Sequence, residues 1–360
     1  MIIADNQRLV PDGLADWGDK EPESGTEVSI SSKLKTKFHR PLRAKLIFNA
    51  GSGKPEESPQ QLAEILAEMQ NHEILPEVYT VRPDSQLETV VRNAIKSGIR
   101  LIVVAGGDGT IDSVVGAMVG SNAILGVIPT GTRNNVAFNL GIPEDIAKSV
   151  ALLRRGQSLK IDVGRVHYGH SRRWFLEAAA LGLLSDLYPL ADDIQHGKLT
   201  RIGELLSTLV SATPAQLHIT LEEHKHLDST EHMLLISNMA FLGPHFQISP
   251  RVSFKDGYLD LFTFSDMNKL NMISYAMLAQ LGLVENSGIT HYRVKHVKIR
   301  STPHMPILAD GVMLGQGSLS VQIYPRALTI MAGSSRTRRK STSRLTASNR
   351  LTASKRAANG

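Results

Sequence analysis

Three polar, glycine-bearing segments each follow an apolar run of the sequence. They are Asn49-Ala50-Gly51-Ser52-Gly53, Gly106-Gly107-Asp108-Gly109-Thr110 and Pro129-Thr130-Gly131-Thr132-Arg133-Asn134-Asn135. Glycine lets a backbone approach a ligand closely, and successive N–H groups at the start of a helix bind anions. The chemistry that these segments suggest is the binding of a phosphate.

Asp108 is the unusual residue of the second segment, because a carboxylate repels a bare phosphate. It fits if a cation such as Mg²⁺ lies between the two charges, or if Asp108 serves as a base. The alternative is a tight turn in which Asp108 caps the helix that follows. The segment is neither a GxxxxGK[ST] phosphate loop nor a GxGxxG dinucleotide fingerprint.

Alternating strands and helices position these segments. The pattern predicts strands at 44–50, 74–81, 99–105 and 123–129, and helices at 60–70, 85–98, from the second segment to about 119, from 132, and at 143–156. This alternation predicts an α/β domain with a parallel sheet, in which the carboxyl ends of the strands share one edge. We therefore expect the three segments to converge at that edge.

The pattern changes after about residue 158, where strands joined by turns predominate. The predicted strands are 159–168, 172–181, 216–224, 232–241, 257–264, 292–301 and 318–325, with helical segments near 198–211 and 267–284 and a possible return strand at 326–333. The expected organisation is a flexible leader (1–42), an α/β domain (43–157), a β-rich domain (158–325), the return strand to the first domain and a disordered tail (334–360).

The motifs NAGSGK, GGDGT and PTGTRNN, with LGIP at 140–143, resemble those of the diacylglycerol kinase catalytic domain family. That family includes sphingosine kinases, ceramide kinases and bacterial soluble lipid kinases, and its usual motifs are NPxSG, GGDGTxNEVxNG and PxGTxNDFARxLGIP. The resemblance continues through IDVG, FKDGYLDL and LADG and covers roughly residues 44–331. It implies an α/β ATP-binding domain, a β-sandwich-like lipid-substrate domain, and transfer of the ATP γ-phosphate to a lipid hydroxyl, diacylglycerol-like by default.

The resemblance also implies roles for individual residues. The nucleotide would contact Asn49, Gly51, Ser52, Gly53, Thr80, Gly106, Gly107, Asp108, Gly109, Thr110, Gly131, Thr132 and Asn134. Asp256, with main-chain oxygens of Ser253 and Tyr258, would hold Mg²⁺, which prefers hard oxygen ligands. Without the family, a plain turn is the better interpretation of Asp256. Asp310 would be the general base that accepts the proton of the acceptor hydroxyl, with Asp108 as the second catalytic carboxylate.

Three departures from the family motifs each remove a carboxylate. Val312 replaces the Glu of DGE, Ser113 the Glu of GGDGTxNEV, and Asn135 the Asp of GTxND. Two expectations follow: an active lipid kinase with Asp310 as its base, or a catalytically weakened or inactive lipid- or nucleotide-binding protein of the same fold. A relative of NAD kinase or phosphofructokinase is the other enzyme class, because those proteins also use GGDG.

The bulk composition is that of an ordinary globular chain, with 42% hydrophobic and 21% charged residues among 360. No apolar run approaches the ~20 residues that span a bilayer, and the polar, acidic first residues do not resemble a signal peptide. Cysteine is absent, which excludes disulfides and a cysteine nucleophile. We expect a cytoplasmic protein.

The positive charge lies in the last 27 residues, which carry eight Lys or Arg and no acid. The net charge of +6 therefore leaves −2 for the rest of the chain. We expect the tail to attach the protein peripherally to anionic membrane, at ~1 kcal/mol per basic residue. A solubilising or weakly nucleic-acid-binding extension is the alternative, but basic residues without interleaved aromatics indicate no specific nucleic-acid partner. The oligomeric state has no signature in the sequence.

Overall fold

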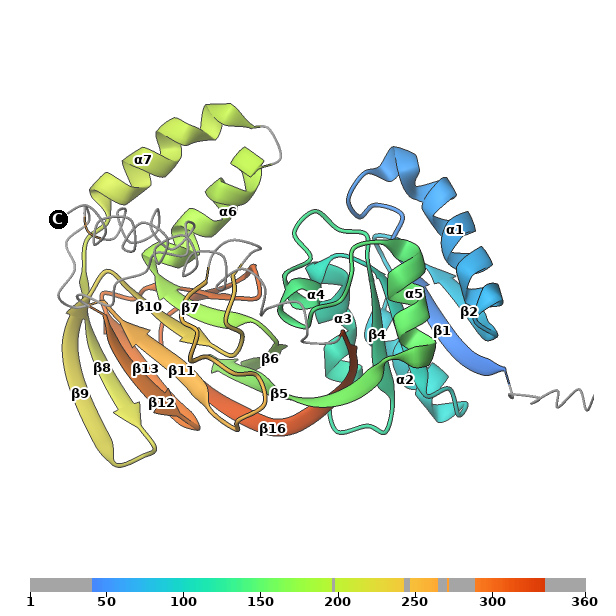
Figure 1. Cartoon of the computed structure of the whole chain (residues 1–360). Helices are drawn as coiled ribbons and strands as arrows, with labels where there is room; N and C mark the ends of the chain where they lie inside the picture. The colour runs from blue at the N-terminus through green and yellow to red at the C-terminus, as the bar shows by residue number, and fades with distance from the viewer. Residues whose placement is uncertain (1–40, 196–197, 243–246, 265–270, 272–288, 334–360) are drawn as a thin grey trace, which may run out of the picture. The chain divides into compact units, whose positions relative to one another are not determined.

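The computed structural model describes residues 41–195, 198–242, 247–264, 271 and 289–333 (Figure 1). The predicted tail lies outside these ranges, as do the predicted leader up to residue 40 and all of the predicted helix at 267–284 except Asn271. Within the described ranges, no helix is both long and apolar enough to cross a membrane.

The first half of the described chain forms a parallel sheet with the order β2-β1-β3-β4. Its strands are β1 Leu42–Phe48, β2 Ile74–Thr80, β3 Leu101–Gly106 and β4 Ile124–Pro129. All six residues of β3 are buried, as expected for a strand covered on both faces. The strand order places the carboxyl ends of β1, β3 and β4 side by side.

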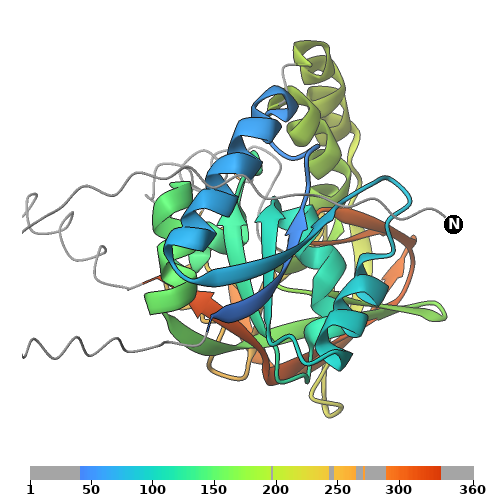
Figure 2. The same ribbon diagram turned by 90° about the vertical axis from the view of Figure 1, so that its right-hand side faces the viewer.

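Helices cover both faces of this sheet (Figure 2). They are η1 Pro55–Glu57, α1 Ser58–Asn71, α2 Leu87–Lys96, α3 Asp108–Met118, α4 Asn135–Asn139 and α5 Ile146–Arg155. Apolar residues of α2 and α3 pack on one face, and those of α1 and α5 pack on the other. These four helices are therefore held by their apolar stripes rather than by helix propensity alone.

Two long strands continue the sheet beyond β4. They are β5 Gln157–Tyr168 and β16 Leu319–Ala332, which pair antiparallel, and β16 also pairs in parallel with β4 through Thr329 and Ile330. The ten-stranded sheet is completed by β6 Ser171–Phe175, β8 Ala215–Leu221, β9 Lys225–Glu231 and β13 His296–Thr302.

A second, six-stranded sheet is antiparallel throughout. Its order is β12 Thr290–Val294, β11 Leu259–Thr263, β10 Met233–Ser237, β7 Ala178–Gly182, β14 Pro306–Ala309 and β15 Val312–Gln316. It packs on the extended first sheet through a continuous apolar core, and α6 Leu183–Gln195 contacts its strands β7, β14 and β10. The helices η2 Leu199–Arg201 and α7 Ile202–Ser211 follow α6 (Figure 1).

The predicted fold class, an α/β domain with a parallel sheet followed by a β-sandwich-like domain, is confirmed. Two predicted strands were wrong as single elements. The run 172–181 divides into β6 and β7, and the run 292–301 divides into β12 and β13, each pair in different sheets. A continuous apolar run does not reveal where a chain crosses between sheets, because both halves are buried. The domain boundaries stay predictions.

Candidate active site

The three glycine-bearing loops lie against one another, and their backbones touch. A Cβ atom on Gly131 would lie 2.4 Å from the Cα atom of Gly107, and one on Gly53 would lie 2.2 Å from the carbonyl oxygen of Thr130. Gly53 also has a φ of +68°, which favours glycine. Larger residues at these positions would separate the loops at the carboxyl ends of β1, β3 and β4.

Side chains of the predicted nucleotide-binding residues brace these loops. Asn49 donates from Nδ2 to Oγ1 of Thr110 at 2.8 Å, and Asn49 Oδ1 accepts the N–H of Gly51 at 3.1 Å. Asn134 bonds Gly131 in both directions, at 3.0 and 2.8 Å. Asn49, Thr110 and Asn134 thus shape the backbone that a ligand would meet.

Asp108 lies at the start of α3, but its carboxylate caps a different helix. It accepts the N–H groups of Asn135 at 2.9 Å and Val136 at 3.1 Å, the first residues of α4. The N-cap of α3 is Gly107, so the interpretation of Asp108 as the cap of its own helix was wrong. Burial raises the pKa of Asp108, and the two N–H groups and the Arg133 guanidinium oppose that rise.

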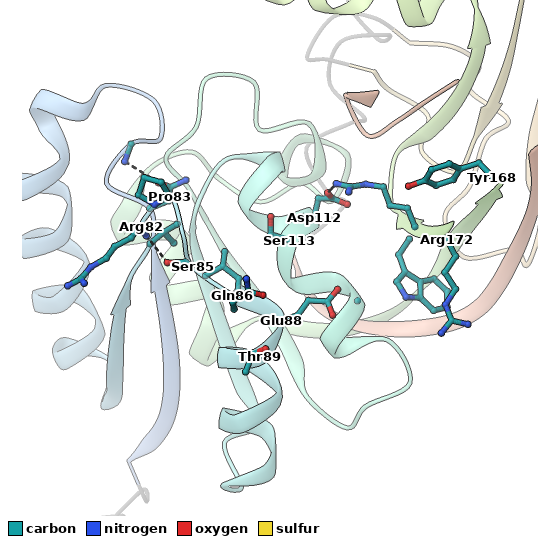
Figure 3. A pocket seen from close by; sticks show the side chains of 17 residues that line it. Arg82, Pro83, Ser85, Gln86, Glu88, Thr89, Asp112, Ser113, Tyr168 and Arg172 are labelled. Carbon is teal, nitrogen blue, oxygen red and sulfur yellow. Dashed lines mark hydrogen bonds and ion pairs between the residues drawn. The ribbon is translucent and has the colours of Figure 1, made fainter. Parts of the chain in front are cut away.

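A pocket of about 880 Å³ opens beside these loops (Figure 3). Its volume falls within the roughly 300–1,000 Å³ typical of small-molecule sites. It is lined by Asn49 and Gly51, by residues 81–83 and 85–89 after β2, by Asp112, Ser113 and Gly116 of α3, and by Tyr168, Arg172, Arg173 and Trp174 of the β5–β6 hairpin. The pocket therefore presents cations and an aromatic face next to the backbone of the first loop.

Asp112 and Ser113 occupy the wall of this pocket formed by α3 (Figure 3). Asp112 forms an ion pair with Arg173, which ties α3 to β6. Burial raises the pKa of Asp112 to about 6, against the effect of Arg173. Ser113 donates from Oγ to the carbonyl oxygen of Gly109 at 2.8 Å, so its hydroxyl is engaged within the helix.

The other predicted nucleotide-binding residues differ in their exposure. Thr80 is exposed at the end of β2, paired in register with Phe48, and Thr132 and Gly109 are also exposed. A Cβ atom on Gly109 would meet no atom outside its own helix within 4 Å. Gly106 instead packs against Thr110, and Ser52 Oγ lies 3.4 Å from a Cβ built on Gly107.

Asp310 accepts hydrogen bonds from the segment in which the chain crosses from β6 to β7. Its Oδ2 accepts the N–H of Leu176 at 2.6 Å, and its Oδ1 accepts those of Glu177 and Ala178, each at 3.0 Å. These N–H groups need an acceptor because the crossing interrupts the strand ladder. Burial raises the pKa of Asp310 to about 7, the Asp112 carboxyl adds to this, and the three N–H groups oppose it.

Tyr188 of α6 connects the third loop to the Asp310-Gly311 turn. The Arg133 guanidinium lies over its ring, 4.7 Å from the centroid, and its hydroxyl oxygen lies 2.8 Å from a Cβ built on Gly311. Val312, which replaces the family's Glu, is exposed just after this turn together with Met313. The structure therefore brings the predicted base turn to the glycine loops through an aromatic side chain.

Asp256 does not fit the Mg²⁺ ion that the resemblance implies. Its Oδ2 accepts from the Arg293 guanidinium at 2.6 Å, and its Oδ1 accepts the N–H of Tyr258 at 3.2 Å. The guanidinium also lies over the Tyr258 ring, 4.4 Å from the centroid. Both carboxylate oxygens of Asp256 thus face N–H donors, and the Arg293 guanidinium already balances the negative charge. Ser253, the other predicted ligand residue before Asp256, precedes this turn in the chain. The geometry is that of a turn before β11.

No group of three or more His, Asp or Glu side chains suited to a metal occurs within the described ranges. Sequence reasoning did not identify Arg173 as the partner of Asp112. It also did not identify Tyr188 beside the Asp310-Gly311 turn, or Glu177 at the crossing between β6 and β7. The polar residues after β2, from Arg82 to Ser85, carried a usable signal, because they follow a fourth parallel strand. The β5–β6 hairpin carried none, since only the folded chain brings it to α3.

The fold and the convergent glycine loops define a kinase-like architecture, and family models agree. Residues 43–166 match the diacylglycerol kinase catalytic domain, and residues 190–332 match the YegS C-terminal NAD kinase beta sandwich-like domain. The two matches are consecutive and together span most of the described chain. Residues 43–166 belong to the diacylglycerol kinase catalytic domain family, as the sequence motifs predicted.

Relatives cover most of the chain. A diacylglycerol kinase of Bacillus subtilis (strain 168) is 29% identical over 280 residues, which are 75% of this chain and 89% of the relative. A diacylglycerol kinase of Mycobacterium tuberculosis (strain H37Rv) is 24% identical over 66% of this chain and 78% of the relative. The crystal structure of a diacylglycerol kinase from Bacillus anthracis superposes with a TM-score of 0.64 at 18% identity, covering 81% of this chain and 97% of that chain. This last similarity supports the fold.

Proposed function

We propose that the protein is an ATP- and Mg²⁺-dependent lipid kinase that transfers the γ-phosphate to a lipid hydroxyl, with a diacylglycerol-like acceptor. The observation that carries the proposal is the contact of three glycine loops at one sheet edge, beside a pocket of about 880 Å³. Family membership and the names of the relatives support the reaction class and the acceptor.

The phosphates would bind where the second loop enters α3. Gly109 is exposed there, and no atom outside its own helix fills the space at its missing Cβ. Helix N-termini and glycine N–H groups favour anions at such a position. Arg82 and Arg172 line the adjoining pocket and would compensate phosphate charge, while Trp174 offers an apolar face to the base. Mg²⁺ would arrive as part of the Mg·ATP substrate.

The acceptor would bind near the Asp310-Gly311 turn. Its hydroxyl oxygen attacks the γ-phosphorus, the bond to the β-γ bridging oxygen breaks, ADP leaves, and the hydroxyl proton passes to Asp310. A carboxyl group with a pKa of about 7 suits this role near neutral pH. Each carboxylate oxygen has two lone pairs, so Oδ2 can accept a proton while it holds the N–H of Leu176.

A specific observation favours a second candidate, a lipid- or nucleotide-binding protein with weakened catalysis. Asp310 accepts three backbone N–H groups and thus also has a structural task, and Val312 provides no second carboxylate. Under this alternative, ATP binds but phosphate transfer is slow or absent.

The test follows the ATP γ-phosphate into mixed micelles that contain diacylglycerol, ceramide, sphingosine or monoacylglycerol, with NAD in solution as a separate acceptor. Gly203→Ala is the control variant, since Gly203 lies in α7 with no atom outside that helix within 4 Å of its missing Cβ. Labelled lipid from the wild type and the control, but not from Asp108→Ala, supports the proposal. Labelled NAD indicates the other kinase class, and nucleotide binding without any product supports the second candidate.

We further propose that the basic tail, residues 334–360, attaches the protein to anionic membrane, in keeping with a lipid substrate. Its support is the presence of eight basic residues and no acidic residue in this segment. Deletion of the tail should weaken sedimentation with vesicles that contain phosphatidylserine and leave ATP affinity unchanged. Equal sedimentation of the full-length and shortened proteins would contradict this proposal.

A further inference from the structure

One side-chain hydrogen bond joins the third glycine loop to the crossing between β6 and β7. Asn135 donates from Nδ2 to Oε2 of Glu177 at 2.8 Å, and both side chains are buried. Asn135 is the first residue of α4, and Glu177 lies in the two-residue break between the strands. The bond therefore connects the nucleotide side of the site to the β-rich half.

The same two residues contact both candidate catalytic carboxylates through their backbones. The N–H of Asn135 donates to Asp108 at 2.9 Å, and the N–H of Glu177 donates to Asp310 at 3.0 Å. A continuous path of hydrogen bonds thus runs from Asp108 through Asn135 and Glu177 to Asp310. The side-chain bond at 2.8 Å is the link that joins the two ends of this path.

A buried carboxyl group at position 177 is expected to lower the free energy of unfolding, so its presence requires a reason. Burial raises the pKa of Glu177 well above its usual range, the Asp108 and Asp310 carboxyls add to the rise, and the Asn135 amide and the Arg133 guanidinium oppose it. A buried carboxyl group is tolerated only with hydrogen-bond partners. Asn135 supplies a neutral donor, whereas an aspartate at position 135 would place two carboxyl groups in direct contact.

Asn135 is also where the sequence departs from the GTxND motif by losing a carboxylate. We propose that Asn135 and Glu177 are a compensating pair, in which Glu177 carries the carboxyl group that the motif places at position 135, and that the pair positions Asp108 relative to Asp310 for phosphoryl transfer. The positioning role rests on the proposed kinase function. The pairing itself does not, because it concerns only the two side chains.

The backbone around Glu177 is held independently of its side chain. Its carbonyl oxygen accepts the N–H groups of Asn238 at 2.8 Å and Met239 at 3.1 Å, and its own N–H is held by Asp310. Conservative changes of the Glu177 side chain should therefore leave the fold intact. This permits a double-mutant cycle on the full-length protein.

The cycle comprises the wild type, Asn135→Asp, Glu177→Gln and the double variant. Asn135→Asp sets carboxyl against carboxyl and should lower both the unfolding midpoint and, by displacing α4 and Asp108, kcat by about tenfold to a hundredfold. Glu177→Gln keeps an acceptor for Asn135 but sets two amides against each other, and should lower kcat and the unfolding midpoint less than Asn135→Asp does. The double variant exchanges donor and acceptor, because the introduced glutamine amide can donate to the introduced aspartate, and should return to within about threefold of wild type.

Three readouts separate positioning from a purely structural role: kcat and KM for ATP measured apart, the pH dependence of kcat, and the unfolding midpoint. We expect Asn135→Asp to lower kcat more than it raises KM, with partial recovery at lower pH as the two carboxyls share a proton. Rescue of the midpoint without rescue of kcat would overturn the positioning role. Additive effects of the two changes in every readout would overturn the pair.

The cycle remains decisive if the wild type phosphorylates no acceptor, which would count against the kinase function alone. The unfolding midpoint and the affinity for Mg·ATP then report on the pair. Recovery of both by the double variant supports the compensating pair without the positioning role, and failure to recover either one overturns it.

Discussion

Two Asp-Gly turns in the β-rich half differ in what their aspartates hold. Asp256-Gly257 and Asp310-Gly311 have nearly the same glycine φ, 78° and 79°. Asp256 accepts the N–H of Tyr258, two residues away, and pairs with the partly exposed guanidinium of Arg293. Asp310 instead accepts three N–H groups from a segment more than 130 residues earlier in the chain.

The difference shows that a dipeptide motif specifies a turn and not its task. Asp256 stabilises its own turn, whereas Asp310 satisfies backbone donors that a crossing between two sheets leaves without strand partners. Burial raises the pKa of Asp310 to about 7, and a raised pKa is also what the proposed base requires. In the proposed mechanism, Asp310 would combine this architectural role with a chemical one.

The largest expected effect comes from Asp310→Asn. The amide NH₂ group would face one of the backbone N–H groups, and a buried donor left without an acceptor costs about 1–3 kcal/mol of the free energy of unfolding. Asp256→Asn is the matched control, because it keeps an acceptor for Tyr258 and loses an exposed ion pair worth about 0–1 kcal/mol. Chemical denaturation measures both, and equal losses would remove the contrast between the turns.

The pH dependence of stability should sharpen the same contrast. Asp310 has a raised pKa of about 7 in the folded state, so between about pH 4 and pH 7 the native chain binds more protons than the unfolded chain. The free energy of unfolding from this group is therefore greatest below about pH 4 and declines as pH rises through about 7. Asp112 contributes with the same sign up to about pH 6. Asp310→Asn should flatten the decline as pH approaches about 7, and an unchanged slope would contradict the assignment.

The smallest effect is expected from Mg²⁺ at Asp256. Because Arg293 already neutralises this carboxylate, millimolar Mg²⁺ without nucleotide should leave the melting temperature of the wild type unchanged. Arg293→Ala exposes the carboxylate and should make the melting temperature respond to Mg²⁺, while Asp256→Asn should not. A Mg²⁺-dependent rise in the wild type that Asp256→Asn abolishes would restore the metal site implied by the family resemblance.

The parallel sheet and its loops could be predicted because each segment carries its own signal. Apolar runs such as 99–105 are bounded by glycine and followed by a helical period, so both the element and the sheet edge follow from local physics. The resemblance of the motifs then extended the prediction to the family. The convergence of the loops needed only the rule that parallel strands end at one edge.

The partners of the polar side chains could not be predicted, because they depend on contacts across the fold. Nothing near Asp108 in the sequence indicates that it caps α4, and nothing near Asp310 indicates the break at Leu176. The helix α6 was missed since Pro189 lies within it and weakens the helical pattern. Glu177 was hidden inside an apolar run that resembled one strand.

The most direct measurement of the central claim is Mg·ATP affinity, by calorimetry, for the wild type, Gly109→Ala and Gly203→Ala. A Cβ on either glycine meets no atom outside its own helix within 4 Å, so both variants should fold, but only Gly109 lies in the loop that we propose binds phosphate. We expect binding by the wild type and by Gly203→Ala, and a loss of affinity of at least about tenfold for Gly109→Ala, equivalent to about 1.4 kcal/mol. Equal affinity of all three proteins would contradict the placement of the nucleotide at these loops.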